Sequence, residues 1–192
     1  GSDLSTLDPY MVARAVSRIE QVWMLETRVG WQHCKAIFSA ISKSTSSLKR
    51  LNISYNDLSM LDPGLLASLV TRLEEVEIDR TELTRHQVEA IITAILAEGC
   101  LVKKLDISCN NLSVVDPSLL ARAVNSMKEV NISNTELTAQ QMETIMTVMD
   151  AGGCPSKKLD ISWNNLSTVD PNLLARVLTG MEEVKWVEVR GE

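Results

Sequence analysis

The chain has 192 residues, 45% of them hydrophobic, and a formal net charge of −6 at pH 7. The apolar content excludes a disordered chain, because it suffices to bury a sizeable core. No apolar run approaches the roughly 20 residues of a membrane span, and the acidic balance disfavours nucleic acid and anionic membranes as main partners. We therefore expect a soluble protein that binds another protein. Residues 1–2, Gly-Ser, resemble the remnant of an expression tag, so residues 3–192 are assigned to a single domain.

The sequence repeats with a period of 54 residues. Residues 57–110 align without a gap on residues 111–164, and 29 of the 54 aligned positions are identical. The same register extends back to residues 3–16 and forward to residues 165–178. Such a period is typical of solenoid proteins, in which neighbouring units share one core.

Each unit contains two copies of the pattern LxxLxLxx(N/T)xL, as in LKRLNISYNDL at residues 48–58 and LEEVEIDRTEL at residues 73–83. Alternating apolar positions predict a strand of about five residues at the start of each copy. About seven such strands are expected along the chain.

Helix signals follow each strand. In the short repeats an Asp-Pro pair predicts a helix start, because aspartate caps free N–H groups and proline has none to leave unpaired. These pairs lie at residues 8–9, 62–63, 116–117 and 170–171. In the long repeats, residues 84–87 and 138–141 are capping boxes, and Gly99 and Gly153 are expected to close the helices.

A repeating strand and helix predict an α/β solenoid. Strands stack about 4.8 Å apart while helices need about 10 Å, so the stack must bend into a horseshoe. Parallel strands then lie on the concave face and helices on the convex face. The polar residues between the leucines indicate a sheet that is open to water.

The segments LDISCNNLS at residues 105–113 and LDISWNNLS at residues 159–167 resemble the asparagine-type repeats of the ribonuclease-inhibitor class of leucine-rich repeats. The alternate repeats carry Thr27, Thr81 and Thr135 where that class usually has cysteine. The class includes the arrays of NOD-like receptors, ribonuclease inhibitor and regulators of small GTPases. The resemblance implies a leucine-rich-repeat solenoid that binds proteins in the cytoplasm, with innate immunity as one setting.

The third, fifth and seventh positions of each pattern are expected to face solvent on the concave side. The third-position row reads Gln21, Arg50, Glu75, Lys104, Glu129, Lys158 and Glu183. Its alternating charges predict an ion-pair ladder that stabilises stacking rather than a binding site.

The predicted binding surface combines the acidic middle of the fifth and seventh rows with loop residues at the eighth position. Glu77, Asp79 and Asp106 should cluster without matching cations in those rows, either steering a basic partner or forming an ordinary solvated surface. Tyr55 and Trp163 fall at the rim, either as interface anchors or lying flat on neighbouring loops. The candidate protein-binding residues are Tyr55, Glu77, Asp79, Arg80, Asp106, Cys109, Asp160 and Trp163.

No catalytic residue, metal ligand or cofactor is predicted. A nucleophile needs a base within reach, but adjacent residues on a helix, such as His33 and Cys34, point about 100° apart. The cysteines include no CxxC pair. Cys100 and Cys154 should lie roughly 10 Å apart in successive repeats, too far for a disulfide, and free thiols indicate a reducing compartment.

Three functions stay open. The leading one is a protein-recognition module from a larger sensor or adaptor, because the chain starts inside one repeat and stops just after a strand; uncapped ends would also allow self-association. The second is a regulator of an enzyme such as a small GTPase, with Arg80 as the loop arginine. The third is an extracellular recognition receptor, because NxS sequons begin at Asn52, Asn111, Asn131 and Asn165. Glycans at Asn52 and Asn131 would obstruct the concave face.

Overall fold

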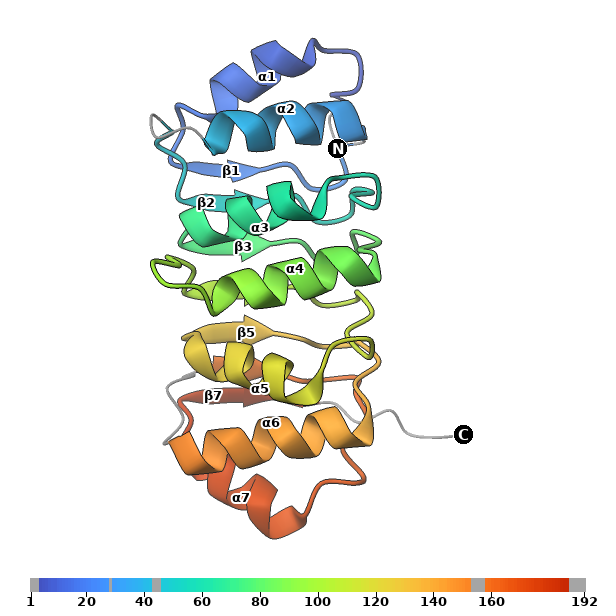
Figure 1. The fold of residues 1–192 in the computed structure, drawn as a ribbon, viewed down its shortest axis with the longest axis vertical. Coiled ribbons are helices and arrows are strands. Elements are labelled where there is room, and N and C mark those ends of the chain that lie inside the picture. Colours follow the sequence, from blue (N-terminus) through green and yellow to red (C-terminus); the bar gives the residue numbers. More distant parts are fainter. Residues whose placement is uncertain (1–3, 28, 43–45, 153–157, 187–192) are drawn as a thin grey trace.

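The computed structural model describes residues 4–27, 29–42, 46–152 and 158–186, in which helices and strands alternate (Figure 1). The strands are β1 (Gln21–Trp23), β2 (Arg50–Asn52), β3 (Glu75–Glu77), β4 (Lys104–Asp106), β5 (Glu129–Asn131), β6 (Lys158–Asp160) and β7 (Glu183–Lys185). The helices are α1 (Pro9–Val16), α2 (Trp31–Ile41), α3 (Pro63–Arg72), α4 (Arg85–Ile95), α5 (Pro117–Ser126), α6 (Ala139–Gly152) and α7 (Pro171–Thr179).

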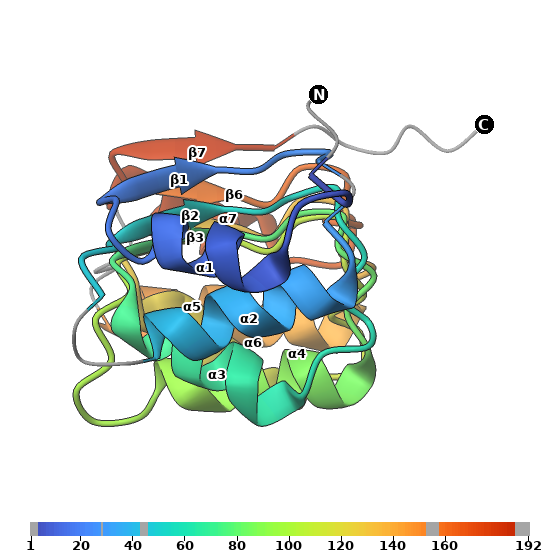
Figure 2. The ribbon, with the colours of Figure 1, turned by 90° about the horizontal axis from the view of Figure 1, so that it is seen from above.

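The strands form one parallel sheet in chain order from β1 to β7. The register pairs equivalent positions of successive repeats, so Leu51 lies opposite Val76 and Leu105 lies opposite Val130. Seen from above, the strands make one layer and the helices the other, and β1 and β7 stand above the strands between them (Figure 2). The predicted horseshoe is confirmed, with parallel strands on the concave face and helices on the convex face.

The strands are shorter than predicted, with three residues each. After β2, β4, β5 and β6 the side chain at the fifth position accepts a backbone N–H two residues later. This bond is 3.0 Å long from Ser54 to Asn52 Oδ1 and from Ser108 to Asp106 Oδ1. Such local bonds compete with the sheet ladder. The prediction that the seventh position faces solvent is therefore wrong for Ser54, Ser108 and Ser162, which are buried.

The helix starts are confirmed. The capping aspartates Asp8, Asp62, Asp116 and Asp170 accept backbone N–H bonds, and proline follows each of them at the first helical position. Thr84 and Gln87 form the predicted capping box, and the backbone N–H of Thr138 donates to Gln141 Oε1 at 2.9 Å. Local sequence signals therefore set where each helix begins.

The helix ends differ from the prediction. The helix α4 ends at Ile95, with Leu96 as its C-cap. Gly99 does not close this helix; with a φ of 81° it turns the chain after the helix has ended. The prediction for Gly153 falls outside the described residues, and α6 extends to Gly152.

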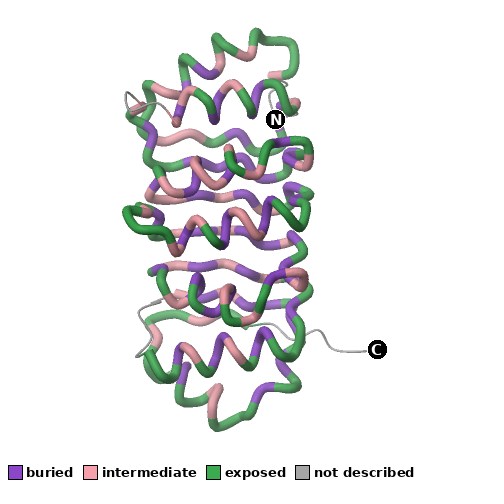
Figure 3. Tube along the Cα trace, in the orientation of Figure 1, coloured by how far each residue is buried: buried purple, intermediate pink, exposed green. Residues whose placement is uncertain are grey.

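The core consists mainly of leucine, isoleucine and valine side chains. Buried residues recur along every repeat of the stack (Figure 3). Leu51, Val76, Leu105 and Val130 follow one another across the sheet, and none is more than 2% exposed. Complete burial of such a side chain contributes about 1.5–3 kcal/mol. This apolar column therefore joins the repeats from β2 to β5.

Buried asparagines at the ninth position form a second link between repeats. Asn110 is 4% exposed, and its Nδ2 donates to the carbonyl of Ile78 in the preceding repeat at 2.9 Å. Its Oδ1 accepts the backbone N–H of Leu83 at 3.2 Å. Asn56 and Asn164 donate in the same way to the repeat before them. These buried side-chain hydrogen bonds therefore hold the turns that follow the strands in place.

Gln87 forms a third link, which the sequence analysis did not predict. Its Nε2 donates to the carbonyls of Leu58 at 2.8 Å and Leu61 at 2.7 Å, both in the preceding repeat. Its Oε1 accepts the backbone N–H of Thr84 at 2.8 Å. One buried amide therefore caps its own helix and binds the neighbouring loop, and Gln141 repeats this arrangement.

Candidate functional site

The third-position charges of the concave face form separate pairs rather than the predicted continuous ladder. The pairs are Arg50–Glu75 at 2.9 Å, Lys104–Glu129 at 3.3 Å and Lys158–Glu183 at 3.7 Å. Lys104 also forms an ion pair of 3.3 Å with Glu77 of the fifth-position row. Among the described residues it forms none with Glu75, its neighbour in the third-position row. Charge pairing therefore crosses between rows.

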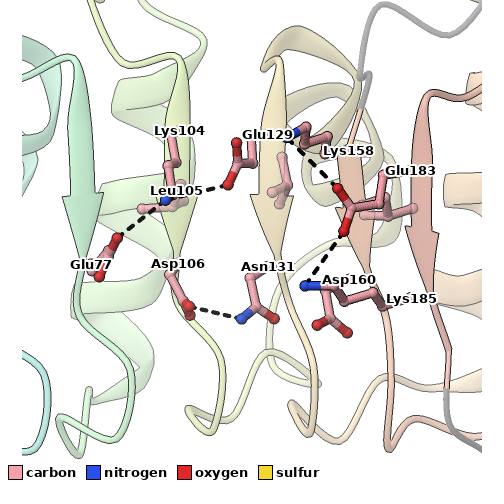
Figure 4. Close-up of a pocket in the computed structure, with 12 residues that line it drawn as sticks. Glu77, Lys104, Leu105, Asp106, Glu129, Asn131, Lys158, Asp160, Glu183 and Lys185 are labelled. Atoms are coloured by element: carbon pink, nitrogen blue, oxygen red, sulfur yellow. Dashed lines mark hydrogen bonds and ion pairs between the residues drawn. The ribbon is translucent and has the colours of Figure 1, made fainter.

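A hollow of about 340 Å³ lies on the concave face over β3 to β7 (Figure 4). Lys104 bridges Glu77 and Glu129 on its two sides. Next to this bridge, Asn131 Nδ2 donates to Asp106 Oδ2 at 2.7 Å. Asp160, on β6, lines the same hollow. The hollow is thus formed by charged and amide side chains over an apolar core.

The acidic middle of the face is partly neutralised. Burial opposes the charge on Lys104, but its two carboxylate neighbours raise its pKa overall. Burial raises the pKa of the Asp106 carboxyl, while hydrogen bonds from Ser108 and Asn131 act against that rise. Among the described residues no cation of the fifth or seventh row pairs with these carboxylates, but Lys104 of the third-position row pairs with Glu77.

Three carboxylates on this face form no ion pair with any described residue: Asp79, Asp106 and Asp160. The negative charge of Asp79 also raises the pKa of Asp106, so these two groups interact across neighbouring strands. Asp160 Oδ1 accepts the backbone N–H of Ser162 at 3.0 Å. Together they leave negative charge available to a cationic partner.

The eighth position forms the rim, directly after each strand. Six of these residues have a left-handed backbone: Glu26 (φ 50°), Tyr55 (60°), Arg80 (50°), Cys109 (54°), Asn134 (52°) and Trp163 (61°). This conformation is uncommon for residues other than glycine. It is held by the next repeat, because the N–H of Tyr55 donates to Asp79 O and that of Cys109 to Ser133 O, each at 3.0 Å. The stack therefore fixes the rim backbone, while its side chain varies between repeats.

A second hollow follows the rim, where Tyr55, Arg80 and Cys109 lie together. The Arg80 guanidinium lies over the Tyr55 ring, 5.4 Å from its centre, as a cation–π contact. The Asn134 amide donates to Cys109 Sγ at 3.5 Å. Tyr55 is still 49% exposed and Trp163 is 54% exposed. Tyr55 therefore contacts a neighbouring loop and also presents a free surface.

The structure places the predicted site residues in two groups. The concave group is Glu77, Asp106 and Asp160, and the rim group is Tyr55, Arg80 and Cys109. Asp79 lies between them after β3, and Trp163 follows β6, four strand spacings or about 19 Å from the position of Tyr55. Lys104 and Asn131 complete the concave hollow. The alternating row of charges predicts only a stacking role for Lys104, whereas the structure also places it in this hollow.

His33 and Cys34 make separate contacts. His33 Nε2 lies 2.9 Å from the carbonyl oxygen of Leu7. Cys34 is 1% exposed, and burial raises the pKa of its thiol to about 12, which keeps it protonated and unreactive at neutral pH. Within the described residues no three metal-ligating side chains gather at one place, and no helix combines the length and apolarity that a membrane crossing requires.

Three segments of the chain, residues 47–69, 101–123 and 157–177, match the family model described as Leucine Rich Repeat. Each match contains one asparagine-type strand, β2, β4 or β6. The chain is also similar to Toll-like receptor 9 of Mus musculus, with 30% identity over 111 residues that cover 48% of this chain and 11% of that receptor. The chain thus carries leucine-rich repeats, and its fold is a leucine-rich-repeat solenoid.

Proposed function

We propose that this chain is a protein-recognition module, which binds a basic segment of another protein through the concave sheet and the adjoining rim. The observation that carries the proposal is the concave sheet itself, which no described helix covers and which bears half-buried charged side chains. Solenoids of stacked repeats use such extended concave surfaces for binding. The leucine-rich-repeat match supports a recognition role over an enzymatic one.

The charge of the face favours a basic partner. Asp79, Asp106 and Asp160 form no ion pair with the described residues, whereas Lys104 already contacts two carboxylates. Carboxylates in a concave face raise the local concentration of a cationic segment and speed its association. Lysine or arginine side chains of the partner would pair with these three aspartates.

The sheet alone is too small for a stable complex. Seven strands span about 29 Å and three strand residues about 10 Å, a flat area of about 290 Å². A typical stable interface buries about 800 Å² on each partner. The rim must therefore contribute, and Tyr55 and Trp163 supply exposed aromatic surface. The next repeat holds the backbone of Tyr55 in place. A fixed backbone lowers the ordering cost of binding.

A short peptide of alternating arginine, leucine and glycine is a suitable probe for the concave charge. Asp79→Lys/Asp160→Lys should weaken its binding about tenfold or more and flatten the salt dependence of association. The control Glu98→Lys/Glu143→Lys makes the same change in net charge at exposed residues away from the sheet and should change binding by less than about twofold. Equal losses in both variants, measured by surface plasmon resonance at two salt concentrations, would show that only net charge matters.

Trp163→Ala tests the rim separately. The exposed indole should act on the lifetime of a complex, because desolvated contacts are not screened by salt. With a folded protein partner we expect dissociation to be about tenfold faster and association nearly unchanged. An unchanged dissociation rate would remove Trp163 from the binding surface.

The parent protein is, in this proposal, a cytoplasmic sensor or adaptor of the ribonuclease-inhibitor class, similar to NOD-like receptors. Free thiols support a reducing compartment. Cys34, Cys100 and Cys109 are free, and Cys154 lies outside the described residues. A turnover assay with small GTPases tests the alternative of an enzyme regulator that acts through Arg80, which instead stacks on Tyr55 in the absence of a partner.

An extracellular recognition receptor is the second candidate, supported by the similarity to Toll-like receptor 9. Asn52 is 7% exposed and donates to Glu77, so it offers no room for a glycan. Asn111 and Asn165 are exposed in the loops beyond the rim. Glycans at Asn111 and Asn165 would leave the sheet free, so glycosylation of these two residues is compatible with binding on the concave face. Secretion with added mass at Asn111 and Asn165 would favour it over the cytoplasmic proposal.

A further inference from the structure

The convex side holds a groove between α1 and α2 whose chemistry is unlike that of the concave face. Its floor is formed by Ala13, Ala36 and Ala40. Tyr10 and Trp31 stand on its two sides and are 79% and 44% exposed. Large aromatic side chains with this much solvent contact are unusual on a helix that already packs against its neighbour.

The charged residues of this groove are cations. Arg14 from α1 and Lys35 from α2 line it, and among the described residues no aspartate or glutamate does. Neither cation forms an ion pair with a described residue. The Lys35 ammonium instead lies 5.9 Å from the centre of the Trp31 ring. The groove therefore presents positive charge next to exposed aromatic surface.

The internal repeat supplies two comparisons for this groove. The 54-residue period aligns Tyr10 with Gly64 in the second unit and Ser118 in the third, and it aligns Trp31 with Arg85 and Ala139. The cation Lys35 is replaced by a carboxylate in both, and the aligned residues are Glu89 and Glu143. In the second unit Glu89 pairs with Arg85 at 2.9 Å, so a surface ion pair stands where the first unit has Trp31 and Lys35.

These differences are not required by the packing of the helices. The short and long helices lie side by side in all three units, α1 with α2, α3 with α4 and α5 with α6. The alanine floor at Ala13 recurs as Ala67 and Ala121. Two units therefore form the same helix pair without an aromatic residue or a lysine at these exposed positions. Tyrosine, tryptophan and arginine are the residue types that dominate binding energy at protein interfaces.

We infer that the α1–α2 groove binds an acidic peptide segment that carries an aromatic or aliphatic side chain. The apolar side chain lies between Tyr10 and Trp31 over the alanine floor, and flanking carboxylates pair with Arg14 and Lys35. Charge complementarity identifies this occupant, because the groove has cations without carboxylates. The module then holds two segments of opposite charge, an acidic one on its convex side and a basic one on its concave side. The groove does not depend on the function proposed for the concave face.

The probe is an acetylated peptide that alternates aspartate with phenylalanine and leucine, titrated into ¹⁵N-labelled protein and followed by nuclear magnetic resonance. We expect saturable shifts of the Trp31 indole N–H and of the α1 and α2 amides. The variant Tyr10→Ser/Trp31→Ala/Lys35→Glu installs the residues of the third unit, which that unit shows to be compatible with the fold. It should weaken binding at least about tenfold. Asp79→Lys/Asp160→Lys, on the concave face, should leave the affinity for this peptide within about twofold or raise it slightly.

A second variant, which transfers the groove residues of the first unit to the third unit, tests the inference even if the first variant is destabilised. Ser118→Tyr/Ala139→Trp/Glu143→Lys builds the groove between α5 and α6, where Arg122 already occupies the place of Arg14. It should create a second binding site for the same peptide. A peptide with lysine in place of aspartate that binds equally well would overturn the inference. Shifts of the groove that grow with protein concentration in the absence of peptide would also overturn it, since the occupant would then be a second copy of the chain.

Discussion

The buried amides between repeats and the charged side chains of the concave sheet are both polar links from one repeat to the next, but their surroundings differ. Asn110 is 4% exposed and bonds backbone groups that water cannot reach. The side chain of Lys104 is 32% exposed and shares two carboxylates on an open face. A buried group that loses its partner costs about 1–3 kcal/mol, whereas an exposed ion pair contributes about 0–1 kcal/mol. Stability therefore resides in the interior links, and the concave side chains can change for binding without unfolding the stack.

Asn110→Ala should produce the largest effect, a loss of about 4 kcal/mol in the free energy of unfolding. The substitution leaves the buried N–H groups of Thr81 and Leu83 without the acceptor that they share. Urea denaturation measures the loss. Asn111→Ala, at the next and exposed residue, is the matched control and should cost less than about 1 kcal/mol. Equal losses in the two variants would contradict the proposed role of the buried amides.

Leu105→Ala measures the apolar link in the same repeat. Leu105 is 1% exposed at the centre of β4 and lies between Val76 and Val130 of the neighbouring strands. Loss of burial and the remaining cavity should lower the free energy of unfolding by about 3 kcal/mol. A loss below about 1 kcal/mol in the same urea titration would mean that this column does not support the stack.

Gln87→Ala tests the glutamine that caps its own helix and contacts the preceding loop. Three carbonyl groups of that loop lose the donor that they share, so we expect a loss of about 2 kcal/mol. The control Glu89→Ala, two residues along the same helix, removes only a surface ion pair with Arg85 and should cost about 0.5 kcal/mol. Faster hydrogen exchange at residues 58–61 in the first variant, and not in the control, would locate the effect at the loop.

The elements that the sequence predicted well are those with one local cause. An aspartate before a proline strongly favours the N-cap of a helix, so the sequence predicted the helix starts at residues 9, 63, 117 and 171. The apolar rows followed from the period. Gly99 had two possible roles, helix closure or a later turn, and its position in the sequence did not distinguish them. Every strand ends after three residues, including β3, and a hydrophobic pattern does not reveal where the pairing stops.

The candidate site was harder to predict because its pairings are degenerate. Lys104 has Glu75, Glu77 and Glu129 on the two adjacent strands, and only the side-chain geometry selects two of them. The left-handed backbone of the rim could not be predicted either, since left-handed residues usually appear as glycine or asparagine. Tyr55 adopts that conformation because the next repeat holds its backbone, with its N–H donating to Asp79 O. A contact between repeats overrides the local preference.

Lys104→Gln should have the smallest effect on the free energy of unfolding, while it removes a positive charge from the concave face. Because folding raises the pKa of this ammonium above its ordinary 10.5, its contribution is complete below that pH and is lost as pH rises through the folded value. At neutral pH we expect a loss of less than about 1 kcal/mol, smaller in high salt.

A double-mutant cycle of Lys104→Gln with Glu77→Gln isolates this pair, and its coupling energy should also shrink with salt. The single variant should bind the arginine peptide more tightly, because two carboxylates lose their intramolecular cation. A loss comparable to that of Asn110→Ala would mean that the concave charges hold the stack together. Binding on that face would then compete with folding, and the division between interior links and exposed charges would fail.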